Sequence, residues 1–178
     1  MAAEPRRAET DRIAEARRGD PEALAALYRQ YGDDIMGVAF RLTGSRADAE
    51  DVLHDVFLGL PEALARYEER GNLRAWLRQV AARVALMRLR AGRRKREVPL
   101  ETVPELRDEA QAEPETPLAV ARALAWLPPG MRAVFVLKVV EGYSHAEIGE
   151  LLGISVKASE VRLTRALKAL RKQLERSR

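Results

Sequence analysis

The chain has 178 residues and a formal net charge of +4, with 47% hydrophobic and 33% charged residues. This length suits one medium domain or two small ones, and the composition excludes a chain that is disordered throughout. The sequence contains no cysteine, which excludes disulfides, thiolate metal sites and cysteine nucleophiles, and its two histidines are too few for the usual zinc sites. Alanine and leucine supply much of the apolar share, so we expect an all-α protein with no metal and no cofactor.

The sequence shows neither a membrane span nor a secretion signal. Residues 1–18 are rich in arginine and glutamate and lack the apolar core of a secretory signal. The longest nearly apolar run, Ala133 to Val140, is too short to cross a bilayer and contains Lys138. We therefore expect a soluble cytoplasmic protein without membrane insertion.

Charge is distributed unevenly along the chain. Residues 83–96 contain seven basic and no acidic residues, residues 97–117 contain seven acidic and one basic residue, and residues 157–178 contain eight basic and two acidic residues. Two basic segments separated by an acidic one are typical of two contacts with a polyanion such as nucleic acid. Either basic block, taken alone, is equally compatible with a solvated helix face.

The first half of the chain is predicted to be helical. Asp20 caps a helix whose apolar residues recur every three or four positions until Gly44. Ser45 begins a second helix, which Pro61 should end or kink before a short continuation. Asn72 can cap a third helix that runs into the first basic block.

A linker is predicted between two helical modules. Residues 97–117 carry four of the nine prolines, the acidic run and almost no periodicity, which favours a flexible and partly extended segment. The predicted division is an N-terminal extension over residues 1–19, a first domain over 20–96, the linker over 97–117 and a second domain over 118–178.

The second module has the pattern of a helix-turn-helix. Two short helices are expected around the turn at residues 128–130, and Ser144 with Glu147 forms a capping box for the next helix. Gly153 allows a tight turn, after which Ser155 caps a long basic helix with Leu163, Leu167, Leu170 and Leu174 inward. Such a helix would enter the major groove of DNA, although an ordinary helical hairpin has the same pattern.

Several motifs together resemble one family. Residues 47–58, ADAEDVLHDVFL, look like the DAEDLVQETFL helix of bacterial RNA polymerase sigma factors, and LRAWL at 73–77 looks like the FRAWL that follows it. The segments LPP at 127–129, EGYSHAEI at 141–148 and LGIS at 152–155 resemble the family's LP…EGLSYEEIAEILGIS stretch. The segment VRLTRA at 161–166 resembles the family's SRLHRA. The length and the two modules are similar to the extracytoplasmic function (ECF) subgroup, which keeps only regions two and four.

The resemblance implies that an acidic helix docks on core RNA polymerase. In sigma factors this helix of region two binds the clamp helices of the β′ subunit, and region four contacts the β flap. The corresponding face here consists of Asp48, Asp51, His54 and Asp55. The alternative is a solvated face whose acids favour the helix N-terminus. His54 replaces the usual Gln and would add a charge that depends on pH.

The resemblance also implies that the third helix binds the −10 promoter element and holds one strand open. The residues implied are Asn72, Arg83, Met87, Arg88, Arg90, Arg93 and Arg94. Residues 68–72 align with the loop that captures a flipped base in the family, whereas Trp76 falls on the apolar stripe and is expected in the core. Arg83 replaces the usual Asn and Met87 the usual Asp, so the motif read here differs from the family's.

The last helix would read the −35 element. The residues expected to face DNA are Lys157, Ser159, Glu160, Arg162, Arg165 and Lys168. Ser159 replaces a Val that packs in the core of the family's helix-turn-helix, and its hydroxyl could bond back to the Ser155 carbonyl. Glu160 could accept a hydrogen bond from a cytosine amino group or could pair with Lys157 or Thr164.

The sequence therefore predicts an all-α, two-domain transcription initiation factor and not an enzyme. Its expected partners are core RNA polymerase, promoter DNA and, as in many such factors, an anti-sigma factor. A stand-alone helix-turn-helix regulator would explain the second module but leaves the acidic helix without a purpose. A helical adaptor that binds only protein would have no salt-dependent affinity for DNA.

Overall fold

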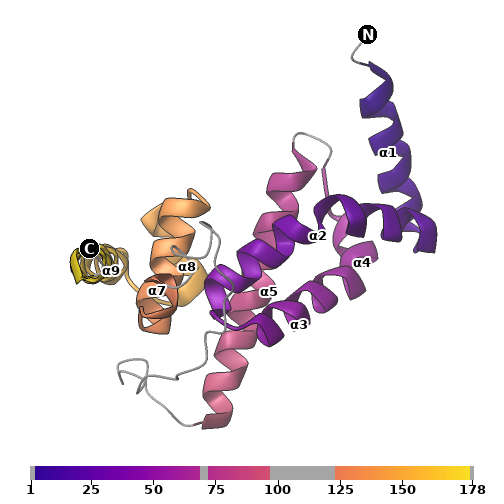
Figure 1. Cartoon of the computed structure of the whole chain (residues 1–178). Coiled ribbons are helices and arrows are strands. Elements are labelled where there is room, and N and C mark those ends of the chain that lie inside the picture. The colour runs from indigo at the N-terminus through magenta and orange to yellow at the C-terminus, as the bar shows by residue number, and fades with distance from the viewer. Residues whose placement is uncertain (1–2, 69–71, 97–122, 177–178) are drawn as a thin grey trace.

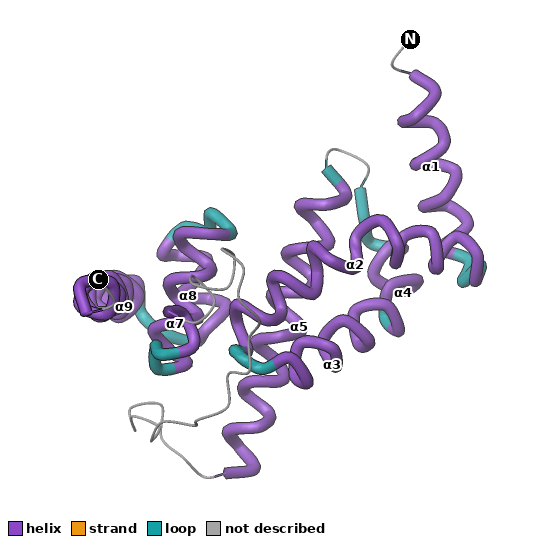
Figure 2. The backbone as a smooth tube through the Cα atoms, viewed as in Figure 1, coloured by secondary structure: helices purple, strands orange, loops and turns teal. Residues whose placement is uncertain are grey.

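The computed structural model describes residues 3–68, 72–96 and 123–176, and these residues form helices and turns without a strand. Figures 1 and 2 show the helices in two groups, one from each half of the chain. The elements are α1 (Ala3–Arg17), α2 (Pro21–Thr43), α3 (Arg46–Leu58), α4 (Leu60–Ala65), α5 (Leu73–Arg96), α7 (Pro129–Phe135), the π-helix η1 (Val136–Val140), α8 (His145–Leu152) and α9 (Val156–Arg176). The predicted all-α fold with two small helical domains is confirmed.

The predicted helix starts are occupied by capping side chains. The side chain of Asp20 accepts a hydrogen bond from the backbone N–H of Ala23, and that of Ser45 accepts one from Asp48. Ser144 and Glu147 form a complete capping box at the start of α8. These contacts satisfy N–H groups that the first turn of a helix leaves without partners, so each fixes where its helix begins.

The second helix ends near Pro61 and is followed by a short helix, as predicted. Helix α3 stops at Leu58, and Gly59 separates it from α4, in which Pro61 lies in the first turn. Proline is well tolerated there because a first-turn N–H has no partner within the helix. Pro61 therefore lies in the first turn of the short continuation, and the break itself falls at Gly59.

The N-terminal helix belongs to the first bundle, although residues 1–19 were predicted to be an extension outside it. Ile13 and Ala16 of α1 are buried, and the guanidinium of Arg17 donates to the carbonyls of Leu64 and Tyr67 at 2.9 and 2.8 Å. Helix α1 is highly charged, so its apolar face is narrow, and its packing depends on these contacts with residues about 50 positions away.

The first bundle is built around α2, which packs against both α3 and α5. Its centre consists of fully buried aliphatic side chains, namely Leu27, Ile35, Leu42, Val52, Val56, Leu60, Leu64 and Leu77. Burial of each such side chain stabilises the fold by about 1.5–3 kcal/mol. Trp76 is half-buried and packs on this core beside Tyr67, as expected from its position on the apolar stripe.

The second group consists of α7, η1, α8 and α9. Leu124, Leu137 and Ile148 are buried at its centre, and α9 packs across both α7 and α8. Leu167, predicted to point inward, is 50% exposed, because the buried row of α9 runs through Ser159 and Ala166 instead. The predicted linker (97–117), the helix start at residues 117–122 and the side chain of Leu174 lie outside the described residues.

Candidate polymerase and DNA interfaces

Helix α3 presents the predicted acidic face to solvent. Its buried side consists of Ala49, Val52 and Val56, which pack against α2 and α5. The opposite side carries the four predicted docking residues, of which Asp48, Asp51 and His54 are exposed and Asp55 is half-buried. Because α3 is anchored along its apolar side, these side chains form one surface on a rigid helix.

Two of these carboxylates are paired with an arginine from the predicted −10 helix. Arg88 of α5 donates from Nη1 to Asp51 at 2.7 Å and from Nε to Asp55 at 2.5 Å. The hydrogen bond that Arg88 donates to Asp55 lowers the pKa of Asp55, and the same bond is the main cause that raises the pKa of Arg88. The predicted polymerase-docking face of α3 and the predicted −10 surface of α5 are therefore in direct contact, although they are separate sites in the sequence analysis.

The ion pair predicts a measurable change in the titration of Asp55. Replacing Arg88 with alanine should raise the pKa of Asp55 toward its ordinary value of about 3.9, because the hydrogen bond from Arg88 is the main cause of the depression. Because the pKa of Asp55 is lower in the folded than in the unfolded chain, its ionised form stabilises the fold at any pH above the unfolded-state pKa. This contribution is lost as the pH falls through the folded-state pKa. Side-chain NMR titration of wild type and Arg88→Ala measures the shift. An unchanged Asp55 titration would contradict the pairing.

The described part of the predicted −10 surface lies along α5. Arg83 is exposed and Met87 is 64% exposed, whereas Arg90 donates to the backbone carbonyl of Leu151 in α8. The side chain of Asn72 accepts a hydrogen bond from the N–H of Ala75 at 3.3 Å, which confirms its capping role. Residues 69–71 of the predicted base-capture loop and the side chains of Arg93 and Arg94 lie outside the described residues.

The turn between α8 and α9 has the geometry expected of a helix-turn-helix. Helix α8 ends at Gly153, whose φ of 66° lies in the left-handed region that favours glycine. A side chain at Gly149 would meet the carbonyl oxygen of Ile154 at 2.8 Å, so the turn folds tightly against α8. Ser155 then accepts a hydrogen bond from the N–H of Ala158 at 3.1 Å and begins α9.

Ser159 does not face DNA, and its assignment to the −35 surface is corrected. Its side chain is fully buried, and its Oγ lies 2.8 Å from Nδ1 of His145 in α8. The hydroxyl therefore joins the two helices of the motif instead of bonding back to the Ser155 carbonyl. A short polar side chain fits this apolar position because the histidine ring supplies its hydrogen-bond partner.

Loss of this hydroxyl should affect stability but not recognition. The variant Ser159→Ala is expected to lower the free energy of unfolding by about 1 kcal/mol, because it removes one buried hydrogen bond. The relative affinities of the chain for different −35 sequences should stay the same. Chemical denaturation and DNA titrations measure both quantities, and a changed base preference would show that Ser159 reaches DNA after all.

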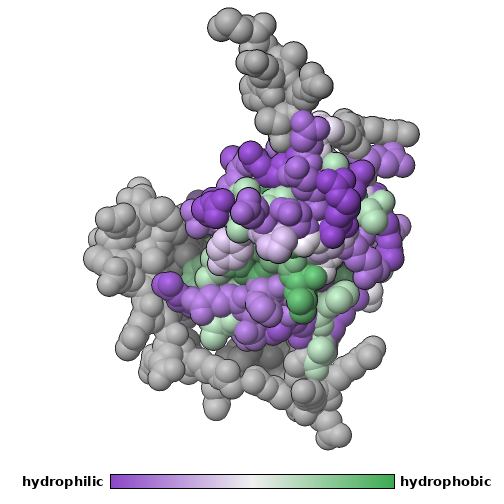
Figure 3. Space-filling model, turned by 90° about the vertical axis from the view of Figure 1, so that its right-hand side faces the viewer, coloured by the Kyte–Doolittle hydropathy of each residue, from purple (hydrophilic) through white to green (hydrophobic). Residues whose placement is uncertain are grey.

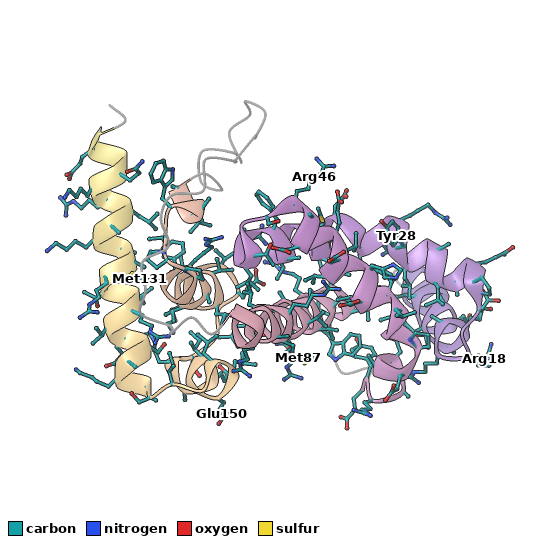
Figure 4. The ribbon with its side chains drawn as sticks, turned by 90° about the horizontal axis from the view of Figure 1, so that it is seen from below. Arg18, Tyr28, Arg46, Met87, Met131 and Glu150 are labelled. Carbon is teal, nitrogen blue, oxygen red and sulfur yellow. The ribbon has the colours of Figure 1, made fainter. Side chains whose placement is uncertain are left out.

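The remaining −35 residues lie on the outer side of α9. Lys157, Glu160, Arg165 and Lys168 are exposed, and Arg162 is half-buried at the edge of the packed face. Lys157 Nζ lies 3.9 Å from Glu160 Oε2, and Thr164 donates to the carbonyl of Glu160. In Figures 1 and 4, α7 and α8 lie between α9 and the first bundle, so this outer side is open to solvent.

Comparison with known proteins identifies both modules. Residues 27–95 match the sigma-70 region 2 family, and residues 118–170 match the sigma-70 region 4 family. The RNA polymerase sigma factor CarQ of Myxococcus xanthus is 31% identical over 166 residues, which cover 89% of this chain and 92% of that protein. The chain belongs to the ECF family of RNA polymerase sigma factors. It is therefore a promoter-directing transcription initiation factor.

Two further comparisons agree with this sigma factor assignment. The ECF RNA polymerase sigma factor SigE of Mycolicibacterium smegmatis is 31% identical over 169 residues, covering 88% of this chain but only 64% of that protein. The solved structure of CnrH, determined in complex with the cytosolic domain of CnrY, is 27% identical with a TM-score of 0.53, covering 96% of this chain and 99% of that one.

One face of the sigma factor is largely polar. Figure 3 views the molecule from the right-hand side of Figure 1 and shows hydrophilic side chains over most of the described surface there, with a smaller apolar area near its middle. None of the described helices is long and apolar enough to cross a membrane.

The sequence analysis did not single out two charged side chains of region 4. The carboxylate of Glu141 is 5% exposed and pairs with two arginines of region 2, and Arg132 is 8% exposed and lies against Gly44 at the end of α2. Both sit within or beside motifs that define the family, but the arginines that pair with Glu141 are 63 and 100 residues away in sequence, and Gly44 is 88 residues away from Arg132. Local sequence patterns carry no signal for such pairs.

Proposed function

We propose that this sigma factor acts in the cytoplasm, where it binds core RNA polymerase through α3 and promoter DNA through α5 and α9. Region 2 would dock on the β′ clamp helices and open the −10 element, and region 4 would contact the β flap and read the −35 element. It would act as a binding and positioning factor and not as an enzyme.

The observation that carries the proposal is the separation of acidic and basic surfaces on rigid helices. The acidic face of α3 offers carboxylates to arginine side chains of a protein partner. The outer side of α9 offers Lys157, Arg165 and Lys168 to DNA phosphates and bases. A chain that binds both a protein and a polyanion needs two such surfaces, and here the acidic face of α3 and the outer side of α9 lie on different domains.

Titration of the labelled full-length chain with core RNA polymerase tests this proposal against its rivals. An initiation factor should bind core polymerase saturably, whereas a stand-alone helix-turn-helix regulator should bind DNA alone. The matched experiment with duplex DNA at two salt concentrations covers the third possibility. A protein-only adaptor should show no salt-dependent affinity for DNA, whereas DNA binding through α9 weakens as counterions compete.

We also propose that an anti-sigma factor regulates this chain. The proposal is supported by CnrH, which resembles it over nearly its whole length and was solved with the cytosolic domain of a second protein. An anti-sigma factor would have to cover at least one of the surfaces described above, so its binding should prevent the chain from binding core polymerase. Competition between the two for the labelled chain measures this directly.

A further inference from the structure

Region 4 packs directly on region 2, and a buried carboxylate lies at the contact. Helix α7 contacts α2, and α8 contacts α5. Between them, the carboxylate of Glu141 accepts hydrogen bonds from Arg78 Nε and Nη2 at 3.0 and 3.1 Å and one from Arg41 at 3.5 Å. Only 5% of the Glu141 side chain is exposed, so a residue of region 4 places a buried negative charge against region 2.

The local backbone aims Glu141 at its partners. The last turn before it is the π-helix η1, in which the N–H of Glu141 donates to the carbonyl of Val136, five residues back. Such wide turns re-aim the residues that follow them. The bidentate hydrogen bonding between Arg78 and Glu141 raises the pKa of Arg78. It also fixes the relative orientation of the two side chains.

A second contact across the same boundary lies at a glycine. Arg132 of α7 lies against Gly44, and a Cβ atom at Gly44 would be 1.6 Å from its Nη1. The carbonyl groups at the end of α2 carry partial negative charge, which favours an arginine at this place. Arg132 donates hydrogen bonds to the carbonyls of Ala125 and Leu127, and no described carboxylate pairs with it.

The packing of region 4 also occupies part of the predicted −10 surface. Arg90 of α5 donates to the carbonyl of Leu151 in α8. The outer side of α9, in contrast, remains open. The contact between domains therefore engages Arg90 of the predicted −10 surface, while Arg83 and Met87 of that surface stay exposed and the outer side of α9 stays free.

We infer that the free chain is held closed by Glu141, and that this closed state weakens the binding of single-stranded DNA to α5, by engaging Arg90, until the domains separate. Without the carboxylate, the charges of Arg41 and Arg78 would face each other while partly buried, which favours separation and hydration. The DNA part of this inference rests on the function proposed for α5, whereas the closed arrangement itself does not.

Distances between spin labels test the closed state directly. Because the sequence has no cysteine, Leu58→Cys in α3 and Lys172→Cys in α9 place one label on each domain at exposed positions. Pulsed electron paramagnetic resonance should give one narrow distance distribution for the otherwise wild-type chain. Glu141→Gln should shift most of the population to longer and broader distances. Glu150→Gln, at an exposed position of α8, makes the same change in charge and should leave the distribution narrow.

A pair of glycine variants repeats the test without changing the charge. Gly44→Ala and Gly19→Ala introduce the same backbone strain, because φ is +71° and +80° at these positions. Only at Gly44 does the new methyl group collide with the opposite domain, since nothing lies within 4 Å at Gly19. Gly44→Ala should therefore open the chain and Gly19→Ala should not. A narrow, wild-type distribution in both Glu141→Gln and Gly44→Ala, or a broad one in the wild type, would overturn the inference.

The affinity for a single-stranded oligonucleotide of about 30 thymines tests the functional part. Opening should raise this affinity about fivefold or more in Glu141→Gln relative to Glu150→Gln, because the competent state becomes the main population. Binding to duplex DNA through α9 should be the same for these two variants. Equal single-strand affinities would refute occlusion of α5 even if the distances change. Failure to bind core polymerase would refute the proposed function and leave the distance measurements valid.

Discussion

Replacing both Asp51 and Asp55 with arginine is expected to lower the affinity for core RNA polymerase about 100-fold while both domains stay folded. A hydrogen bond to a charged group contributes about 1.5–3 kcal/mol, and 1.4 kcal/mol corresponds to a tenfold change in affinity, so losing two such contacts gives this magnitude or more. The internal pairs with Arg88 do not protect these carboxylates from a partner. The ion pairs of Arg88 with Asp51 and Asp55 are partly exposed, and an exposed ion pair contributes at most about 1 kcal/mol to the stability of the fold.

A matched double variant controls for charge in this experiment. Asp33→Arg with Glu62→Arg makes the same change in net charge at exposed positions of α2 and α4, away from the acidic face. Its affinity for core polymerase should stay within about threefold of wild type, and far-UV circular dichroism should show equal helicity in all three proteins. An equal loss in both double variants, or no loss in the Asp51 and Asp55 variant, would remove α3 from the docking surface.

The second large effect is expected in the choice of −35 sequence. Lys157 and Glu160 lie in the first turns of α9, where a recognition helix meets the edges of bases. Replacing either with alanine should change the preferred −35 sequence, by about 1–3 kcal/mol for each affected base pair. Their mutual ion pair is 3.9 Å long and exposed, so little internal stability opposes contacts with DNA.

Arg165 is expected to behave differently because it lies further along the same helix, where side chains reach phosphates. Arg165→Ala should weaken binding to all −35 sequences alike and lower the slope of affinity against salt by about one unit. Arg171→Ala, near the end of α9 and paired with Glu175, serves as the control and should change little. Titrations over a set of −35 variants at two salt concentrations separate these effects. A shift of base preference in Arg165→Ala alone would mean that α9 lies in the groove in the opposite sense.

Local features of the fold could be predicted because the residues that determine them are adjacent in sequence. Asp20, Ser45, Asn72 and Ser144 each cap a helix through a hydrogen bond to a residue three positions away. The same holds for the left-handed turn at Gly153, which needs only the glycine itself. These short-range rules placed the starts of α2, α3, α5, α8 and α9.

The failures share a dependence on contacts between distant parts of the chain. Spacing alone put Leu167 inward, but the side of α9 that is buried was decided by how α7 and α8 pack against it. Ser159 was likewise assigned to the DNA-facing side of α9 from its position in the sequence. Its hydrogen bond with His145 of α8 shows that its side chain is internal. The pairing of Arg88 with the acidic face and of Glu141 with Arg78 joins residues 33 to 63 positions apart, for which periodicity gives no signal.

Transcription in vitro with purified core RNA polymerase tests the central claim most directly. Core polymerase with and without the full-length chain would be supplied with genomic DNA fragments, and the 5′ ends of the transcripts would be mapped. The account predicts discrete start sites that appear only with the chain, share sequence elements upstream, and are lost with the Asp51 and Asp55 double variant. Identical transcripts with and without the chain would contradict its assignment as an initiation factor.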